Sequence, residues 1–260
     1  MRAVSGQTLP SFIFFFFGPL IGIIFGFDVI NSERSRGTLS RVLSQPLFRD
    51  SVINGKFLAG LTAIAIMLAS IILIVSGLGL RMIGVAPGPG EVARIAVFFL
   101  ISLLYVGFWL GLGILFSVLF RRTITSVLAA IAIWISLALF ISMFAGIAAN
   151  WVAPVDQHSE AEAILEHQRV YDSVMRISPT TLFGEATETI LNPGKRTLRG
   201  VVLVREVEGM IPGPLALGQS LMLVWPHLVA LIALILICFA VSYVRFMREE
   251  IRSKCIYLSA

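Results

Sequence analysis

The chain has 260 residues and a net charge of +5, with 57% hydrophobic and only 13% charged residues. Soluble domains contain roughly 45–50% apolar and about 25% charged residues, so this composition excludes a soluble enzyme, a disordered chain and a disulfide-stapled secreted fold. The apolar residues also fall in long blocks, which excludes a membrane β-barrel built from short alternating strands.

Five apolar segments are long enough to cross a bilayer, whose hydrocarbon core of about 30 Å needs about 20 helical residues. In chain order they are Ser11–Phe27, Phe57–Leu80, Ile95–Phe120, Ile124–Val152 and Ser220–Val244. This pattern predicts an all-α polytopic membrane protein with five transmembrane helices.

Polar segments divide the chain into units. Residues 1–149 contain the first four spans and a long polar loop at 28–56. Residues 150–219 are polar and are expected to be rich in helix. Residues 220–244 form the last span, and residues 245–260 form a basic tail.

Basic residues indicate which side of the membrane each polar segment occupies, because Lys and Arg on short segments are retained in the cytoplasm. The 28–56 loop, the Arg121-Arg122 turn and the 245–260 tail together carry eleven Lys and Arg residues, whereas the short segments on the other side carry three. We therefore expect a multi-pass protein of the cell (inner) membrane whose 28–56 loop and C-terminus are cytoplasmic. The N-terminus and residues 150–219 are then external.

Small residues repeat at four-residue spacing on three of the predicted spans, and this spacing lets helix backbones approach closely in a membrane. The positions are Gly18, Gly22 and Gly26 on the first span, Gly107 and Gly111 on the third, and Ala138, Ser142 and Gly146 on the fourth. Packing within the chain is the preferred interpretation, because five helices already need many internal contacts. A dimer seam is the alternative.

The 28–56 loop is longer than a connection between two spans requires, and its pattern predicts a short amphipathic helix. Gly37-Thr38 ends the preceding helix, and Thr38 is a favourable N-cap for a new one. Apolar residues then recur at helical spacing on one face; they are Leu39, Val42, Leu43 and Leu47. Ser40 points the other way, and Pro46 ends the helix. The apolar face contacts either the lipid interface or a protein partner.

Histidines mark two further places. His227 follows Pro226 in the last span, and ionisable groups inside a membrane are functional candidates. A hydrogen-bonded His beside a proline kink is preferred there, with a substrate ligand as the alternative. His158 and His167 lie in an acidic stretch, for which we expect a solvated amphipathic helix near Glu160–Met175 rather than a metal site.

Three strings in the 28–56 loop form a specific pattern: Asp28-x4-Glu33-Arg34-x2-Gly37-Thr38-Leu39, then Leu43-Ser44-x-Pro46-x2-Arg49, then Gly55-Lys56. Weaker features follow in Arg121-Arg122, in Ile177-Ser178-Pro179 and in the tail Phe246-Met247-Arg248-x-Glu250-Ile251-Arg252. Together these residues resemble the ABC-2-type transporter permeases, in particular the group similar to the nitrous-oxide-reductase maturation permease. The resemblance covers most of the chain.

The resemblance implies the permease subunit of an ATP-binding cassette (ABC) transporter, working as an exporter. Two permeases, as a homodimer or heterodimer, would form the translocation pathway, and two separate ATPase subunits would bind in the cytoplasm. The Leu39–Pro46 segment would be the coupling helix, seated in a groove of the ATPase. The residues that the resemblance assigns to this contact are Glu33, Gly37, Thr38, Leu39, Val42, Leu43, Pro46 and Arg49. For Glu33, a local pair with Arg34 or Arg36 is preferred to a contact with the ATPase.

The chain contains no GxxxxGK[ST] phosphate-binding loop, so ATP and Mg would be bound by the partner chain. We expect no catalytic residue, metal or cofactor in this chain and no nucleic-acid partner; membrane lipid surrounds the spans. An intramembrane enzyme or a channel-like protein without an ATPase partner is the alternative, although the HExxH and GxSxG motifs are absent from the sequence. The family has six spans, so the resemblance also implies a span before Ser11 that is missing here.

Overall fold

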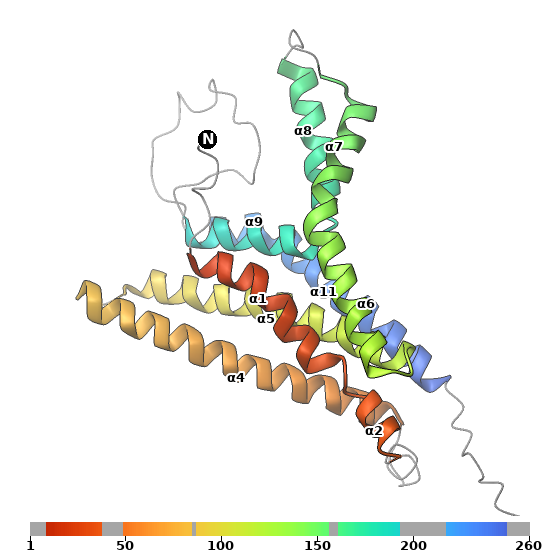
Figure 1. Ribbon diagram of the computed structural model, residues 1–260. Helices are drawn as coiled ribbons and strands as arrows, with labels where there is room; N and C mark the ends of the chain where they lie inside the picture. Colours follow the sequence, from red (N-terminus) through yellow and green to blue (C-terminus); the bar gives the residue numbers. More distant parts are fainter. Residues whose placement is uncertain (1–8, 38–48, 85–86, 156–160, 193–216, 249–260) are drawn as a thin grey trace, which may run out of the picture.

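The computed structural model describes residues 9–37, 49–84, 87–155, 161–192 and 217–248, and these residues contain helices and no strand (Figure 1). The elements are α1 Leu9–Gly26, α2 Asn31–Ser35, α4 Arg49–Ile83, α5 Pro89–Leu119, α6 Thr123–Ile135, the π-helical turn η1 Ser136–Phe140, α7 Ile141–Val152, α8 Ala161–Met175, α9 Pro179–Leu191 and α11 Leu217–Met247.

Each of the five predicted spans overlaps a helical stretch that is long and apolar enough to cross a membrane. Within the described residues these stretches are Phe14–Ser35, Ser51–Met82, Pro89–Leu119, Thr123–Val152 and Leu217–Met247. The prediction of an all-α polytopic protein with five apolar spans is therefore confirmed for this part of the chain.

Helix α5 begins at Pro89, inside the proline–glycine run 86–90 where the sequence indicates turn-forming residues. Proline is tolerated in the first helical turn because its missing N–H would have no partner within the helix. The N–H of Gly88 donates to the carboxylate of Glu91 over 2.9 Å, which caps the helix. Helix α5 therefore begins before Ile95, where the sequence predicts the start of this span.

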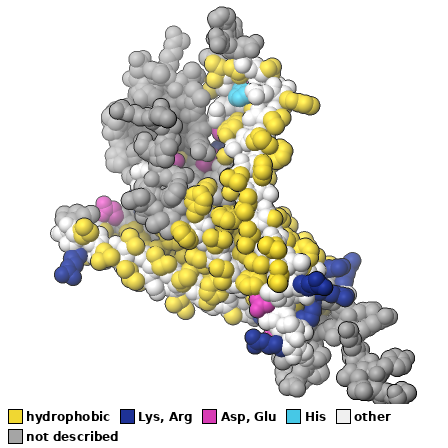
Figure 2. Space-filling view, in the orientation of Figure 1, with side chains coloured by type: hydrophobic (Ala, Val, Ile, Leu, Met, Phe, Trp, Pro, Cys, Tyr) yellow, Lys and Arg dark blue, Asp and Glu magenta, His cyan; other side chains and the backbone are white. Residues whose placement is uncertain are grey.

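Helix ends gather at one end of the bundle, which we call the basic end. In Figure 1, α2, the start of α4, the end of α5, the start of α6 and the end of α11 lie there. Figure 2 shows Lys and Arg side chains concentrated at the same place. The basic residues on these described segments include Arg34, Arg36, Lys56, Arg121, Arg122, Arg245 and Arg248. The segments predicted to share one side of the membrane therefore leave the bundle at the same end.

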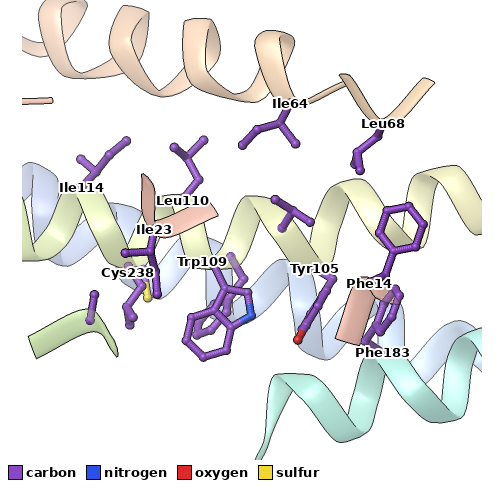
Figure 3. Close-up of a cluster of buried hydrophobic side chains, with 14 of the residues drawn as sticks. Phe14, Ile23, Ile64, Leu68, Tyr105, Trp109, Leu110, Ile114, Phe183 and Cys238 are labelled. Atoms are coloured by element: carbon purple, nitrogen blue, oxygen red, sulfur yellow. The ribbon is translucent and has the colours of Figure 1, made fainter. Parts of the chain in front are cut away.

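Helix α5 lies at the centre of the bundle, in contact with α1, α4, α6, α9 and α11. Every residue from Tyr105 to Ile114 is buried. The side chains that pack around it come from all five of these helices; they include Phe14, Ile23, Ile64, Leu68, Phe183 and Cys238 (Figure 3).

Glycines let α1 lie directly on the backbone of α5. A Cβ atom added to Gly22 would lie 2.6 Å from the carbonyl oxygen of Val106, and one added to Gly26 would lie 2.6 Å from the carbonyl oxygen of Leu110. A Cβ on Gly18 would lie 2.9 Å from the ring of Tyr105. The small-residue face of the first span therefore contacts α5 within the same chain.

The small residues on the other two spans have different surroundings. A Cβ on Gly107 would lie 3.2 Å from Leu61 in α4, and one on Gly111 would lie 3.7 Å from Cys238 in α11. A Cβ on Gly146 would meet none of the described residues within 4 Å.

The α6–η1–α7 helix contacts α5 and α1 through α6, but little of it is buried. Figure 2 shows a broad hydrophobic surface over this helix; its exposed apolar side chains include Ile124, Leu128, Leu139, Phe144 and Trp151. Helix α8 lies where the sequence predicts an amphipathic helix, and it packs against α7. A ring nitrogen of His167 lies 2.8 Å from the carbonyl oxygen of Ala153, which ties α8 to the end of α7.

We expect Gly22→Ala to destabilise the protein, because the new methyl group meets the backbone of α5, which cannot move aside as a side chain can. The expected cost is about 1–3 kcal/mol, and it lowers the midpoint of thermal unfolding in detergent, followed by tryptophan fluorescence. Gly77→Ala in α4 is the matched control, because its methyl group would meet no described atom within 4 Å. An unchanged midpoint for Gly22→Ala would contradict the close α1–α5 contact.

Candidate functional site

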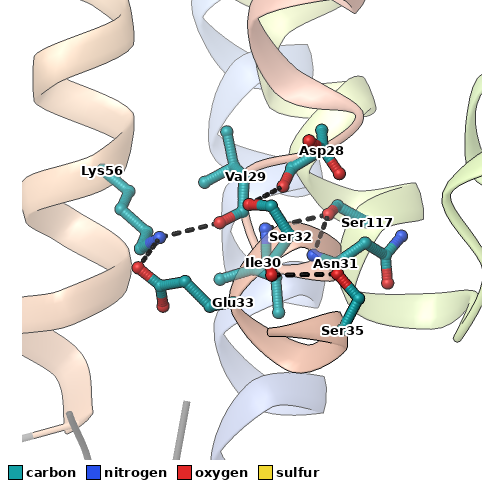
Figure 4. Close-up of polar contacts among 9 residues, drawn as sticks. All are labelled: Asp28, Val29, Ile30, Asn31, Ser32, Glu33, Ser35, Lys56 and Ser117. Atoms are coloured by element: carbon teal, nitrogen blue, oxygen red, sulfur yellow. Dashed lines mark hydrogen bonds and ion pairs between the residues drawn. The ribbon is translucent and has the colours of Figure 1, made fainter. Parts of the chain in front are cut away.

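The segment between α1 and α4 begins with a compact turn of residues 27–34, which we call the junction. It is bound to the end of α5 (Figure 4). The buried backbone N–H groups of Ile30 and Asn31 donate to the hydroxyl oxygen of Ser117 over 3.0 and 3.2 Å. The side chain of Ser32 donates to the carbonyl oxygen of Asp28 over 2.7 Å and closes the turn. One serine of α5 therefore fixes the backbone where the chain leaves the first span.

Lys56 ties the same junction to α4. Its ammonium group donates to the carbonyl oxygen of Val29 and to the carboxylate of Glu33, each over 2.7 Å (Figure 4). Both side chains of this ion pair are mostly shielded from solvent, with 23% and 26% exposure. A shielded pair with a further hydrogen bond holds its geometry better than an exposed pair. The structure thus gives Glu33 a partner on the following helix, which the sequence did not indicate; the pairing with Arg34 or Arg36 stays a prediction.

Helix α6 also contacts the junction. The hydroxyl group of Thr123 donates to the carboxylate of Asp28 over 3.2 Å, and that of Ser126 donates to the carbonyl oxygen of Phe27 over 3.2 Å. Arg34 donates to the carbonyl oxygen of Phe120 over 3.3 Å. The junction is therefore bonded to three different helices, α4, α5 and α6.

Gly37 ends the described part of this segment. Its φ of +68° lies in the left-handed region that favours glycine, directly after α2. Thr38, Leu39, Val42, Leu43 and Pro46 lie outside the described residues, and so does the predicted amphipathic helix. The chain is described again from Arg49, the first residue of α4.

The hydrogen bonds at the basic end couple the junction to its neighbouring helices. A segment that is hydrogen-bonded to three helices moves with them, because most of these contacts are at least partly shielded from water and so hold their geometry. Residues 27–34 are therefore held to α4, α5 and α6 together.

A second polar cluster lies in the other half of the bundle, around His227 in α11. Its Nε2 lies 2.8 Å from Oε2 of Glu185 in α9, and Nε of Arg176 donates to the same oxygen over 3.1 Å. The side chains of His227 and Glu185 are only 4% and 5% exposed. Burial favours the protonated form of Glu185, but the hydrogen bond from His227 and the charge of Arg176 outweigh it and hold the pKa of this carboxyl below its usual value.

The sequence indicates His227 but not its partner. Glu185 is 42 positions away in the chain, in a helix with no long apolar run to mark it. The start of that helix does carry a signal, because Ser178 and Pro179 are typical of an N-cap followed by a first helical residue. The helix was therefore predictable from its sequence, whereas the contact with His227 was not.

Metal ligands do not gather in the part of the chain that the structure describes: no three His, Cys, Asp or Glu residues are placed to hold one ion there. His158 lies outside the described residues.

These observations define a polytopic helical membrane protein with a hydrogen-bonded junction at its basic end. A family model described as ABC-2 family transporter protein matches residues 2–251, so the chain belongs to this family and is a membrane-embedded permease component of the ABC transporter class. No curated protein matches the chain.

We expect Ser117→Ala to loosen the junction, because two buried N–H groups lose their acceptor at once. An unsatisfied buried group costs about 1–3 kcal/mol, so hydrogen exchange of the peptide containing Ile30 and Asn31 becomes faster and the unfolding midpoint falls. Ser70→Ala is the control, since the exposed Ser70 hydroxyl bonds only to its own helix at Ile66 among the contacts seen. Unchanged exchange in Ser117→Ala would show that the serine does not fix this backbone.

Proposed function

We propose that this chain is the permease subunit of an ABC exporter, which works as a dimer and is driven by separate ATPase subunits. The observation that carries the proposal is the junction at the basic end, in a chain of the ABC-2 family. It connects the segment that resembles a coupling loop to three spans through short hydrogen bonds.

The ATPase contact is assigned to the segment between Glu33 and Arg49. In this proposal Leu39, Val42 and Leu43 form the apolar stripe of a coupling helix that sits in a groove of the ATPase. Closure of the ATPase pair on ATP displaces the helix, and the junction carries the displacement into α4, α5 and α6. Gly37, Thr38 and Pro46 set the ends of the helix.

ATP and Mg are assigned to the partner, and this chain is assigned no catalytic residue and no cofactor. The sequence has no GxxxxGK[ST] loop to cradle the phosphates. The subgroup of nitrous-oxide-reductase maturation permeases, and the additional span that it implies, stay predictions.

The dimer is assigned to the α6–η1–α7 helix. The glycines of α1 are in contact with α5 of the same chain, so their face of α1 is not available to a second permease. The stripe of Ala138, Ser142 and Gly146 lies on the one candidate span that is almost unburied among those described, and small residues permit close helix pairing in lipid. A second permease, identical or related, is the proposed occupant.

The basic end is assigned to the cytoplasm, because its short segments carry the excess of Lys and Arg. The N-terminus and α8 are then on the external side of the cell membrane, α9 lies in the external half of the bundle, and the C-terminus is cytoplasmic.

We expect Leu43→Glu to abolish association with the cognate ATPase while the permease still inserts into the membrane. A charge in an apolar interface costs several kcal/mol unless it finds a partner, which is enough to lose a micromolar contact. The measurement is pull-down of the ATPase encoded beside the permease. Ser40→Glu places the same charge on the opposite helix face and should retain binding. Equal pull-down by both variants would refute the coupling-helix assignment.

We expect single cysteines at Ser35 and Ser173 to report opposite sides of the membrane. Both serines are exposed, one in α2 and the other in α8. In a background that lacks Cys238 and Cys255, an impermeant maleimide added to intact cells should label position 173 and leave position 35 unlabelled until the cells are opened. The reverse pattern would overturn the proposed orientation, and with it the docking side of the ATPase.

A further inference from the structure

Helix α9 is a polar helix that lies inside the bundle, along the half of α5 that is remote from the basic end. Arg94 donates to the carbonyl oxygen of Ile190 over 2.8 Å. The ring of Tyr105 stacks on that of Phe183, with 4.4 Å between the ring centroids. Arg94 and Tyr105 are eleven positions apart in α5, which is about 16 Å along the helix. Helix α9 therefore runs antiparallel to α5, from its middle towards its start.

The buried face of α9 is unusually polar for a helix in this position. It includes Thr180, Thr181, Glu185, Thr187 and Thr189, all buried. Thr187 and Thr189 donate to carbonyl oxygens of their own helix, so they add no link to a neighbour. Glu185 instead bonds to His227 of α11 and to Arg176. It is the charged residue that connects the middle of α9 to the last span.

The Glu185–His227 contact uses only part of the hydrogen-bonding capacity of its two groups. Oε1 of Glu185 and Nδ1 of His227 are both buried, and neither has a partner among the described residues. On the same side of α11, two turns away, the buried hydroxyl group of Ser220 also lacks a partner there. A buried polar pair that is only half satisfied stabilises a fold less than apolar residues of the same volume would.

A purely structural contact between α9 and α11 would be better made from apolar side chains. The hydrogen-bonded pair has a different property: its strength depends on the alignment of the two groups, and it is lost as a unit when they separate. Such a contact suits a position with two states rather than one.

We propose that the Glu185–His227 pair is a clasp that holds α9 closed against α11, with Arg176 orienting the carboxylate, and that its release lets α9 move out of the bundle and open the end opposite the basic end. The clasp acts within one chain. It goes beyond the proposed ATPase contact and does not depend on it.

The test uses a buried reporter on α9. Thr187→Cys is placed in the full chain lacking Cys238 and Cys255, and the rate of maleimide labelling is measured in detergent, where both ends are accessible. Thr187 is buried, so a cysteine at this position can be labelled only when α9 moves away from its neighbouring helices. We expect Glu185→Gln and His227→Gln each to accelerate labelling about tenfold, the factor expected when one charge-assisted hydrogen bond is lost.

Two further variants separate a clasp from a general loss of packing. The double variant Glu185→Gln/His227→Gln should label no faster than the faster single variant, because the same contact is broken. Glu166→Gln, on an exposed carboxylate of α8, should leave the rate unchanged.

The proposal is overturned if the single variants label at the original rate, or if their effects multiply in the double variant. Glu185→Asp keeps the charge, shortens the side chain and serves where a glutamine variant does not fold; it should also label faster, and an unchanged rate would count against the clasp in the same way. Pull-down of the ATPase with these variants should match that of the unmodified chain. A loss of pull-down alone would bear on the proposed function and not on the clasp.

Discussion

The burial of α5 is the constraint on which the other contacts depend. A helix surrounded by five neighbours must satisfy its backbone internally and present side chains that let each neighbour approach. Helix α1 meets it through Gly22 and Gly26, α4 and α11 lie against Gly107 and Gly111, and α9 stacks on Tyr105. At the basic end Ser117 of the same helix accepts a hydrogen bond from the backbone of the junction. A shift of α5 therefore alters every one of these contacts.

The two polar clusters differ in how their polar groups are hydrogen-bonded. At the basic end Ser117 accepts two N–H groups and Lys56 donates to both a carbonyl oxygen and a carboxylate, while the buried Nδ2 of Asn31 has no partner among the described residues. In the other half, Glu185 and His227 share one contact and keep unused polar atoms. In the proposed mechanism the basic end passes the displacement of the coupling helix to the spans, and the Glu185–His227 contact is the one that breaks.

The sequence predicts the spans well because bilayer thickness acts directly on composition: a long apolar run without charges is rarely compatible with any environment but lipid. It predicts close packing from Gly18, Gly22 and Gly26, but not that α5 is the partner, since any helix fits a small-residue face. Glu185 and Lys56 could not be paired with His227 and Glu33 from sequence alone, because these contacts depend on how helices distant in the chain meet. The Leu39–Pro46 helix lies outside the described residues and stays a prediction.

The π-helical turn Ser136–Phe140 has a consequence for the shape of the whole fourth span. Such a turn accommodates one more residue than an α-helical turn, and each residue advances an α-helix by about 100°. The rotation of α7 about the helix axis, relative to α6, therefore depends on the one additional residue in the π-helical turn. Removing it would swing the alanines that face α8, Ala145 and Ala149, by about a quarter of a revolution. The hairpin of α7 and α8 would then point in a new direction while the helix itself stayed unbroken.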